Sequence, residues 1–233
     1  MDQGSVKELV GKKAVETMVK SGMKLGLGTG STAMPAVRHV GLLLRQGVLK
    51  DIRAVPTSFQ TSIECEKWGI PLFSLNSAEI RGELDLTIDG ADEVDPRGYC
   101  IKGGGGALLV EKITAYASKA YVIVADETKV VENLGLRFPL PIEVIPEARV
   151  SVSLALEAFG GELMLREAVR KAGPVITEHG NLLLDLRFKR PVDPVLLETE
   201  LNRIPGIVEN GFFTRLIPRV LVGHADGTVE IRD

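Results

Sequence analysis

The repeated succession of a short apolar strand, a turn and an amphipathic helix constrains this 233-residue chain more than any other feature. Lys24 to Leu27 has the pattern of a strand, Gly28 to Thr32 is a glycine-rich turn, and the residues from Met34 to Leu44 return to helical spacing. The alternation continues with strands at Ile52 to Val55, Pro71 to Leu75, Leu84 to Asp89 and Tyr121 to Ala125, and helices at Ser58 to Lys67 and Ala107 to Ala117. A helix that ends near Ser21 and Gly22 opens the chain. This order predicts an α/β fold with a parallel sheet covered by helices on both faces.

A cluster of prolines near Leu136 interrupts this pattern. Pro139, Pro141 and Pro146 lie within a few residues, a density typical of a crossing between domains. Beyond it we expect a smaller α+β unit with helices at Ser151 to Ala158 and Pro194 to Asn202 and strands at Glu162 to Arg166, Val175 to Thr177 and Asn181 to Arg187. Ile204 to Gly206 is the expected return, and a hairpin of Arg219 to Val222 and Thr228 to Arg232 is expected to complete the first domain. The predicted domains are residues 1–134 with 206–233, and residues 135–205.

Composition excludes several classes of partner. Apolar residues make up 45% of the chain and charged residues 25%, an ordinary globular balance. The net charge of -3 and the lack of a basic stretch argue against nucleic acid, and no apolar run approaches the ~20 residues that span a bilayer. The charged N-terminus does not resemble an export signal, so we expect a cytoplasmic location. Cys65 and Cys100 are expected to be free, packed thiols, and the expected partner is a small molecule.

The turn that contains Gly26, Gly28 and Gly30 is a candidate anion site. Backbone N–H groups approach an anion closely there, the helix dipole adds ~0.3–1 kcal/mol, and Ser31 and Thr32 add hydroxyl donors. The third glycine of the dinucleotide fingerprint and the Gly-Lys-Ser/Thr of a Walker A loop are missing, so a simple phosphate fits better than a nucleotide. A turn that merely caps a helix remains an equal alternative.

Two further segments carry chemistry. Asp89, Asp92 and Glu93 put three carboxylates at the carboxyl end of a buried strand, where open α/β sheets bind ligands, although a capped turn would also explain one of them. Lys102 precedes four glycines, and Glu111 lies about one turn into the helix that they open. A base, a cation and several free N–H groups are what a protein needs to remove a proton next to a carbonyl. Taken alone, Glu111 would be a helix acid favoured by the dipole.

Other polar residues carry weaker signals. Lys129 follows the predicted strand Tyr121 to Ala125. From there it could reach the same strand edge as the other candidate residues, although a loop lysine is more often solvated. His39, His179 and His224 lack ligand spacing, so we expect neither a zinc site nor a catalytic histidine.

These motifs together resemble ribose-5-phosphate isomerase type A along the whole chain. The segments GLGTGST, DGADE, KGGGGALLVEK, ADETK, FPLPIEV and IPGIVENGFF stand in that family's order and spacing, although Gly106 replaces an alanine that many relatives carry. The resemblance implies a Rossmann-like larger domain, a small α+β domain inserted before the C-terminal return, a homodimer or homotetramer, and no metal or cofactor. The implied activity is the interconversion of ribose 5-phosphate and ribulose 5-phosphate through an enediolate, in the non-oxidative pentose phosphate pathway.

The resemblance also implies roles for particular residues. Glu111 would be the base, Asp89 would assist ring opening, Asp92 would relay protons, and Lys102 with the glycine amides would stabilise the oxyanion. The residues expected to bind substrate are Lys7, Thr29, Gly30, Ser31, Thr32, Asp89, Gly90, Ala91, Asp92, Lys102, Gly103, Gly104, Gly105 and Lys129.

Two other functions stay open at this point. One is a CoA-transferase-like enzyme with a nucleophilic glutamate, and the other is a sugar-phosphate sensor without activity. The chain looks short for a CoA site and has no segment left for a helix-turn-helix.

Overall fold

A computed structural model describes all 233 residues, which divide into two compact units. Unit 1 comprises Met1–Ala91, Val110–Val130 and Leu216–Asp233, and unit 2 comprises Asp92–Leu109 and Val131–Arg215. None of the helices is both long and apolar enough to span a membrane.

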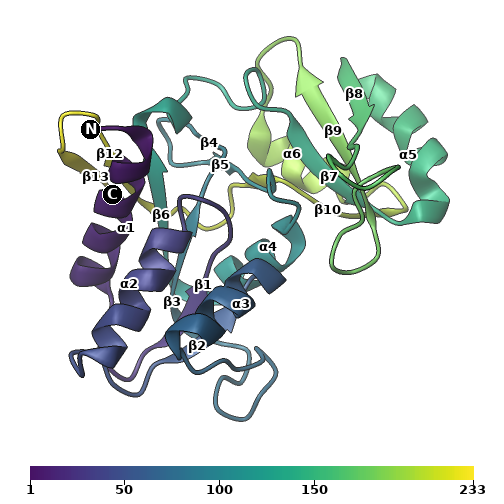
Figure 1. Cartoon of the computed structure of the whole chain (residues 1–233). Helices are drawn as coiled ribbons and strands as arrows, with labels where there is room; N and C mark the ends of the chain where they lie inside the picture. The colour runs from purple at the N-terminus through teal and green to yellow at the C-terminus, as the bar shows by residue number, and fades with distance from the viewer. The chain divides into compact units, whose positions relative to one another are not determined.

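Unit 1 is built on a six-stranded sheet with the order β13-β12-β6-β3-β1-β2 (Figure 1). All neighbouring pairs are parallel except β12 with β13. The strands are β1 (Lys24–Leu27), β2 (Arg53–Pro56), β3 (Leu84–Gly90), β6 (Ser118–Asp126), β12 (Arg219–Gly223) and β13 (Val229–Arg232). The helices are α1 (Gln3–Met18), α2 (Met34–Arg45), α3 (Phe59–Trp68), α4 (Leu108–Tyr116, which enters unit 1 at Val110) and the 3-10 turn η1 (Glu127–Lys129).

The two faces of this sheet are covered by different helices. Side chains alternate along a strand, so Leu25 and Leu27 point to one face and Gly26 to the other. The two leucines join the core that α1 and α2 supply, whereas a Cβ on Gly26 would lie 2.5 Å from Thr114 Cγ2 of α4. Burial on both faces explains why β6 contains the continuous apolar run from Ala120 to Ala125, and why the polar residues Thr87 and Asp89 of β3 are also buried.

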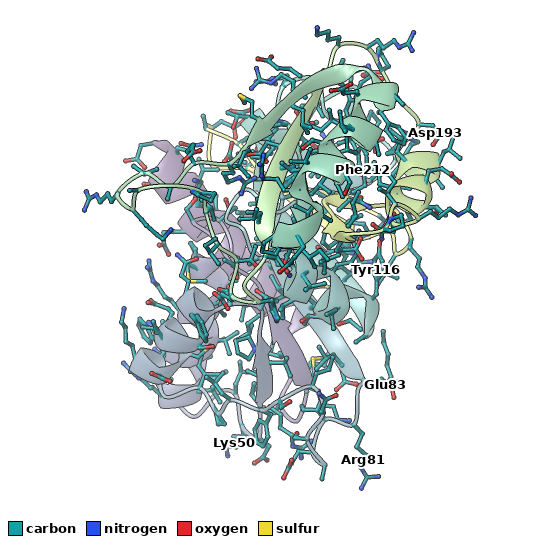
Figure 2. All side chains as sticks on the ribbon, turned by 90° about the vertical axis from the view of Figure 1, so that its right-hand side faces the viewer. Lys50, Arg81, Glu83, Tyr116, Asp193 and Phe212 are labelled. Carbon is teal, nitrogen blue, oxygen red and sulfur yellow. The ribbon has the colours of Figure 1, made fainter.

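The carboxyl ends of the parallel strands meet at one edge of the sheet, and the opposite edge is marked by charged loops. Figure 2 shows Lys50, Arg81 and Glu83 gathered at that opposite edge, where the chain enters β2 and β3. The glycine turn after β1 and the acidic segment after β3 therefore lie at the other edge, the one at which ligands bind in such folds.

Unit 2 contains two small antiparallel sheets, with the orders β10-β7-β9-β8 and β11-β5-β4. Its strands are β4 (Glu93–Val94), β5 (Cys100–Ile101), β7 (Leu140–Val144), β8 (Gly161–Leu165), β9 (Leu182–Phe188), β10 (Ile207–Asn210) and β11 (Phe212–Phe213). Its helices are α5 (Arg149–Leu156) and α6 (Pro194–Leu201), with 3-10 turns η2 (Pro146–Ala148) and η3 (Glu157–Phe159). A separate apolar core fills this unit, and within it the rings of Phe188 and Phe212 stack with centroids 6.1 Å apart.

The structure confirms the predicted α/β class with an antiparallel second part, and it corrects three local predictions. The proline-rich segment taken as a crossing contains β7, a central strand in which Pro141 lies opposite Asp185. Pro71 to Leu75 is not a strand, because only Leu72 forms a single bridge, to Ala54. Val175 to Thr177 likewise makes only one isolated bridge, through Ile176.

The units also differ from the predicted domain boundaries at 134/135 and 205/206. The chain changes unit at 130/131 and 215/216, and residues 92–109 group with unit 2. The reason is pairing over long sequence distances, since β4 and β5 form a sheet with β11. The division into two separate domains stays a prediction.

The unit 2 core gives a first test of this architecture. We expect Phe212→Ala to lower the free energy of unfolding by ~3–5 kcal/mol, because Phe212 is 0% exposed and its removal leaves a cavity beside Phe188. Val169→Ala is the control, since Val169 is 99% exposed and should change stability by less than ~0.5 kcal/mol. Denaturant unfolding of both variants measures the difference, and equal midpoints would contradict the packing described here.

Candidate active site

The turn after β1 is held by the carboxylate of Asp89, the residue that follows Ile88 in β3. Asp89 Oδ1 accepts hydrogen bonds from the N–H of Thr29 at 3.1 Å and of Gly90 at 2.7 Å. Leu27 pairs with Ile88, so Gly28 and Asp89 are the next residues on neighbouring strands. A Cβ on Gly28 would lie 2.0 Å from Asp89 Oδ1, which explains why glycine is required at this position. Asp89 itself is 0% exposed.

Hydroxyl groups from the chain after β2 surround Thr29. Its Oγ1 lies 2.7 Å from Thr57 Oγ1, 2.6 Å from Ser58 Oγ and 3.2 Å from Thr61 Oγ1. Thr61 Oγ1 in turn donates to the carbonyl of Gly28 at 2.8 Å. These hydroxyls were missing from the predicted site. The available signal was the polar run that directly follows a strand end, which the helical assignment of Ser58 to Lys67 obscured.

Lys7 and Gln60 complete the surroundings of the turn. Lys7 Nζ lies 2.9 Å from Ser31 Oγ, so α1 brings a cation to the start of α2. Gln60 Oε1 accepts from the N–H of Gly30 at 3.0 Å, and Gly30 has a φ of 92°. Thr32 is buried behind the turn. The result is a turn with a cation, hydroxyls and a helix start, which suits a phosphate.

Glu111 lies in the helix that covers the same end of β1 and β3. Thr114 of α4 contacts Gly26 and Thr87, and Glu111 stands one helical turn earlier. Because α4 leads into β6, which runs parallel to β3, the helix runs antiparallel to the strands. One turn back along α4 therefore corresponds to two residues forward along the strands, toward Gly28 and Asp89. The Glu111 side chain is buried, with 4% exposed.

Lys129 lies in η1, directly after the end of β6 and at the same edge of the sheet. Asp126 holds this turn by accepting from Thr128 N at 3.1 Å and from the Thr128 hydroxyl, while Gln3 Nε2 of α1 donates to its other oxygen at 3.3 Å. Burial favours the neutral carboxyl, but these hydrogen bonds outweigh it and hold the pKa of Asp126 below its usual range.

In unit 2 the four glycines form a turn of their own. Gly106 N donates to Gly103 O at 2.9 Å, and the φ values of Gly103 and Gly106 are 101° and 80°. Gly104 N donates to Asp92 Oδ2 at 2.7 Å, and a Cβ on Gly104 would lie 2.5 Å from Asp92 Oδ1. The carboxylate of Asp92 therefore lies against the backbone of Gly104, and a side chain at this position would displace it.

Lys102 precedes this turn and is buried, with 2% exposed. Its backbone N–H donates to the carbonyl of Gly211 at 3.0 Å. Its ammonium lies 5.5 Å from the ring centroid of Phe213, a distance at which a cation is attracted to an aromatic face. The segment Gly211 to Phe213 thus fixes both ends of the lysine.

Comparisons with known proteins identify the family of the chain. A family model described as ribose 5-phosphate isomerase A (phosphoriboisomerase A) matches residues 53–227. A protein named ribose-5-phosphate isomerase A from Treponema denticola is 57% identical over 99% of both chains. The chain belongs to the ribose 5-phosphate isomerase A family.

Other members of the ribose 5-phosphate isomerase A family support the same assignment. The relative of that name from Treponema pallidum is 55% identical over 100% of this chain and 94% of its own. The solved structure of ribose 5-phosphate isomerase A from Methanocaldococcus jannaschii has a TM-score of 0.92 and 42% identity, with 100% of both chains covered. A solved D-ribose-5-phosphate isomerase in complex with phospho-erythronic acid has a TM-score of 0.95 and 39% identity, again with 100% of both chains covered.

The predicted site residues fall into two groups. Those in unit 1 are Lys7, Thr29, Gly30, Ser31, Thr32, Asp89, Gly90, Ala91, Glu111 and Lys129, and those in unit 2 are Asp92, Lys102, Gly103, Gly104 and Gly105. In unit 1 the structure brings Thr29, Gly90 and Asp89 together, and Lys7 with Ser31. In unit 2 it brings Gly104 and Asp92 together. No group of three or more His, Cys, Asp and Glu side chains has the arrangement of a metal site.

Asp126 gives a prediction for the pH dependence of stability. The pKa of Asp126 is lowered in the folded state, so its carboxylate stabilises the fold. This stabilisation is fully present above the unfolded pKa of about 3.9 and is lost as the pH falls through the lower pKa of the folded state. Asp126→Asn should therefore lower the free energy of unfolding by ~1–3 kcal/mol at pH 7, with a difference that shrinks below pH ~4. Urea unfolding at several pH values measures this. Asp51→Asn is the control, because Asp51 is exposed and its φ of 55° suits asparagine equally well. A difference that persisted unchanged into acid would contradict the assignment.

Proposed function

We propose that this chain interconverts D-ribose 5-phosphate and D-ribulose 5-phosphate through an enediolate, in the non-oxidative pentose phosphate pathway. Membership of the family supports this function. The structural observation that carries it is the buried Glu111 on α4, above the strand ends that hold Asp89 and the hydroxyl-rich turn. The isomerisation needs a carboxylate base, a polar strand edge and a turn with donors for a phosphate.

In unit 1 the proposed roles follow from position. The Gly28 to Thr32 turn and Lys7 bind the phosphate, which serves as a remote handle that keeps the reacting carbons in register. Asp89 assists opening of the furanose ring. Glu111 removes the proton from C2 of the open aldose while the carbonyl oxygen on C1 takes up the charge. It then returns a proton to C1, and the oxygen on C2 becomes the ketone. Lys129 lines the site.

In unit 2 the proposed roles concern the charge on oxygen. Lys102 and the glycine turn from Gly103 to Gly106 stabilise the enediolate oxygen, because fixed donors are most effective where charge develops. Within the turn the donor is the Gly105 amide, since the N–H groups of Gly104 and Gly106 donate to Asp92 and to the Gly103 carbonyl. Asp92, already bonded to Gly104, relays protons between the two oxygens. Gly90, Ala91 and Gly105 contribute to holding the sugar.

The chemistry in this proposal is proton transfer alone and uses no metal or cofactor. We expect exhaustive treatment with a chelator to leave turnover unchanged. Loss of activity that is restored by one particular divalent ion would contradict this part of the proposal.

We also propose a cytoplasmic homodimer or homotetramer. Two free, buried cysteines are compatible with a reducing compartment. Light scattering during size-exclusion chromatography measures the mass of the assembly, and a monomer at micromolar concentration would contradict the oligomer.

Glu111→Gln tests the base directly. It should preserve the fold and the affinity for ribose 5-phosphate while kcat falls by ~10²–10⁴-fold, since the amide cannot accept the C2 proton. Conversion of ribose 5-phosphate to ribulose 5-phosphate, with nothing else added, measures kcat. The same assay on the unmodified protein separates the isomerase from a CoA-transferase-like enzyme and from a sensor. Glu66→Gln is the matched control, because Glu66 is an exposed glutamate of another helix. Near-normal kcat in Glu111→Gln would make Glu111 a structural helix acid.

Lys7→Gln tests the phosphate turn. The loss of one charge next to Ser31 should raise KM for ribose 5-phosphate by about 10-fold or more, because charge-assisted hydrogen bonds contribute ~1.5–3 kcal/mol. The weak reaction of unphosphorylated ribose should barely change. Lys20→Gln, at an exposed lysine beyond the end of α1, is the control. Equal losses on both sugars would show that Lys7 does not contact the phosphate.

A further inference from the structure

Arg166 is an arginine that none of the proposed roles uses. It directly follows β8, and it forms a fork with Asp185 of β9, where Nε donates to Oδ2 at 2.8 Å and Nη2 donates to Oδ1 at 2.5 Å. The side chains are only 16% and 12% exposed. A two-point pair of this kind fixes the plane of the guanidinium, which leaves Nη1 pointing in one defined direction.

That direction leads to the glycine turn of the same unit. Arg166 Nη1 donates to the carbonyl oxygen of Gly103 at 3.0 Å and to that of Gly104 at 3.1 Å. The strand pair β8 and β9 thus holds two successive peptide groups of the turn through one side chain.

Holding these carbonyls also sets the direction of the N–H groups. In a planar trans peptide the C=O and the following N–H point to opposite sides. The carbonyls of Gly103 and Gly104 face Arg166, so the N–H groups of Gly104 and Gly105 are directed away from it. For Gly104 this is visible in the structure, because its N–H donates to Asp92 Oδ2 at 2.7 Å.

Glycines need such an external restraint more than other residues. They have no side chain that packs, and they lose more conformational freedom on ordering than any other residue. Gly104 and Gly105 are exposed, so packing does not fix their peptide planes. The two hydrogen bonds that the Arg166 guanidinium donates to the carbonyl oxygens provide that restraint, because Asp185 of β9 fixes the guanidinium itself.

We propose that Arg166, oriented by Asp185, is a positioning residue that aims the Gly105 N–H group at the oxygen on which negative charge develops and keeps the Gly104 N–H on Asp92. The inference rests on the proposed isomerase function. Arg166 does not contact the substrate in this proposal, and it acts only through the two carbonyls. Its effect is therefore larger on the enediolate than on the bound sugar.

Arg166→Lys separates this role from simple neutralisation of Asp185. Lysine retains a cation for the Asp185 carboxylate. One ammonium on a flexible side chain, however, does not reproduce both the two-point pair with Asp185 and the two hydrogen bonds to the Gly103 and Gly104 carbonyls. If Arg166 only balances a buried charge, lysine restores function. If Arg166 orients the glycine turn, lysine does not restore function.

The experiment compares Arg166→Lys with Arg187→Lys in the complete protein, because Arg187 is an exposed arginine of β9, the strand that carries Asp185. We expect kcat of Arg166→Lys to fall by about 10- to 100-fold with KM changed less than about threefold, since small misplacements of reacting groups reduce rates by such factors. Arg187→Lys should stay within about twofold of the unmodified protein. Inhibition by phospho-erythronic acid should weaken in parallel with kcat, and inhibition by inorganic phosphate should not.

Amide hydrogen exchange provides a readout that does not depend on activity. Exchange over residues 102–108 should become faster in Arg166→Lys at unchanged thermal stability, and not in Arg187→Lys. If Arg166→Lys is too unstable to purify, the Arg166→Gln/Asp185→Asn pair removes both charges together and should show the same kcat loss and faster exchange.

Several outcomes would overturn the inference. They are a kcat of Arg166→Lys within about threefold of the unmodified protein, a rise in KM alone, or unchanged exchange in the turn. Failure of the proposed function is recognised separately, because the unmodified protein would then not convert ribose 5-phosphate at all.

Discussion

The close approach of Gly28 to Asp89 is the contact on which the rest of unit 1 depends. The parallel register pairs Leu27 with Ile88, and the next residue on each strand has to share a space that a Cβ would fill. Glycine leaves that space to the carboxylate, which then fixes the N–H of Thr29. Once this turn is fixed, α2 begins at a defined point, the hydroxyls after β2 meet Thr29, and Lys7 of α1 reaches Ser31. One register therefore determines the surroundings of the whole phosphate turn.

The two units solve the same problem of fixing polar groups in different ways. In unit 1 the polar groups sit at the ends of buried parallel strands, whose pairing leaves them little freedom. In unit 2 they are peptide groups of a glycine turn, which strand pairing does not hold. Side chains from outside the turn replace that pairing, with Asp92 on one N–H and Arg166 on two carbonyls. A turn without side chains can approach a ligand closely, but only if its direction is imposed from elsewhere.

The sequence predicted what depends on local pattern and missed what depends on long-range register. Strand Lys24 to Leu27 was predicted with its observed bounds, because the apolar run ends in a glycine turn and a helical period. The strand β7 was hidden by Pro141, whose missing N–H usually argues against a central strand. The Arg166 and Asp185 pair has no local signal at all. It becomes visible only once β8 and β9 are in register, with Met164 opposite Asp185 and Arg166 just beyond. The hydroxyls around Thr29 were present as a run, but helical periodicity described the same residues equally well.

The acidic segment DGADE shows how one short motif serves both chemistry and folding. The sequence suggested three carboxylates at one edge, yet their hydrogen-bond partners differ. Asp89 accepts hydrogen bonds from the N–H groups of Thr29 and Gly90, Asp92 accepts from that of Gly104, and Glu93 accepts from those of Gly135 and Phe138 at 2.7 Å each.

Glu93 is 2% exposed, and burial raises the pKa of its carboxyl even though the hydrogen bonds from the backbone oppose the shift. A raised pKa means that ionisation of Glu93 above that pKa destabilises the fold, so a gain in stability does not explain this residue. Glu93 instead fixes the position of β4, because its carboxylate binds the backbone of the segment before β7. β4 directly follows Asp92. Glu93 takes no part in the proposed chemistry, but it fixes the strand next to Asp92, which does.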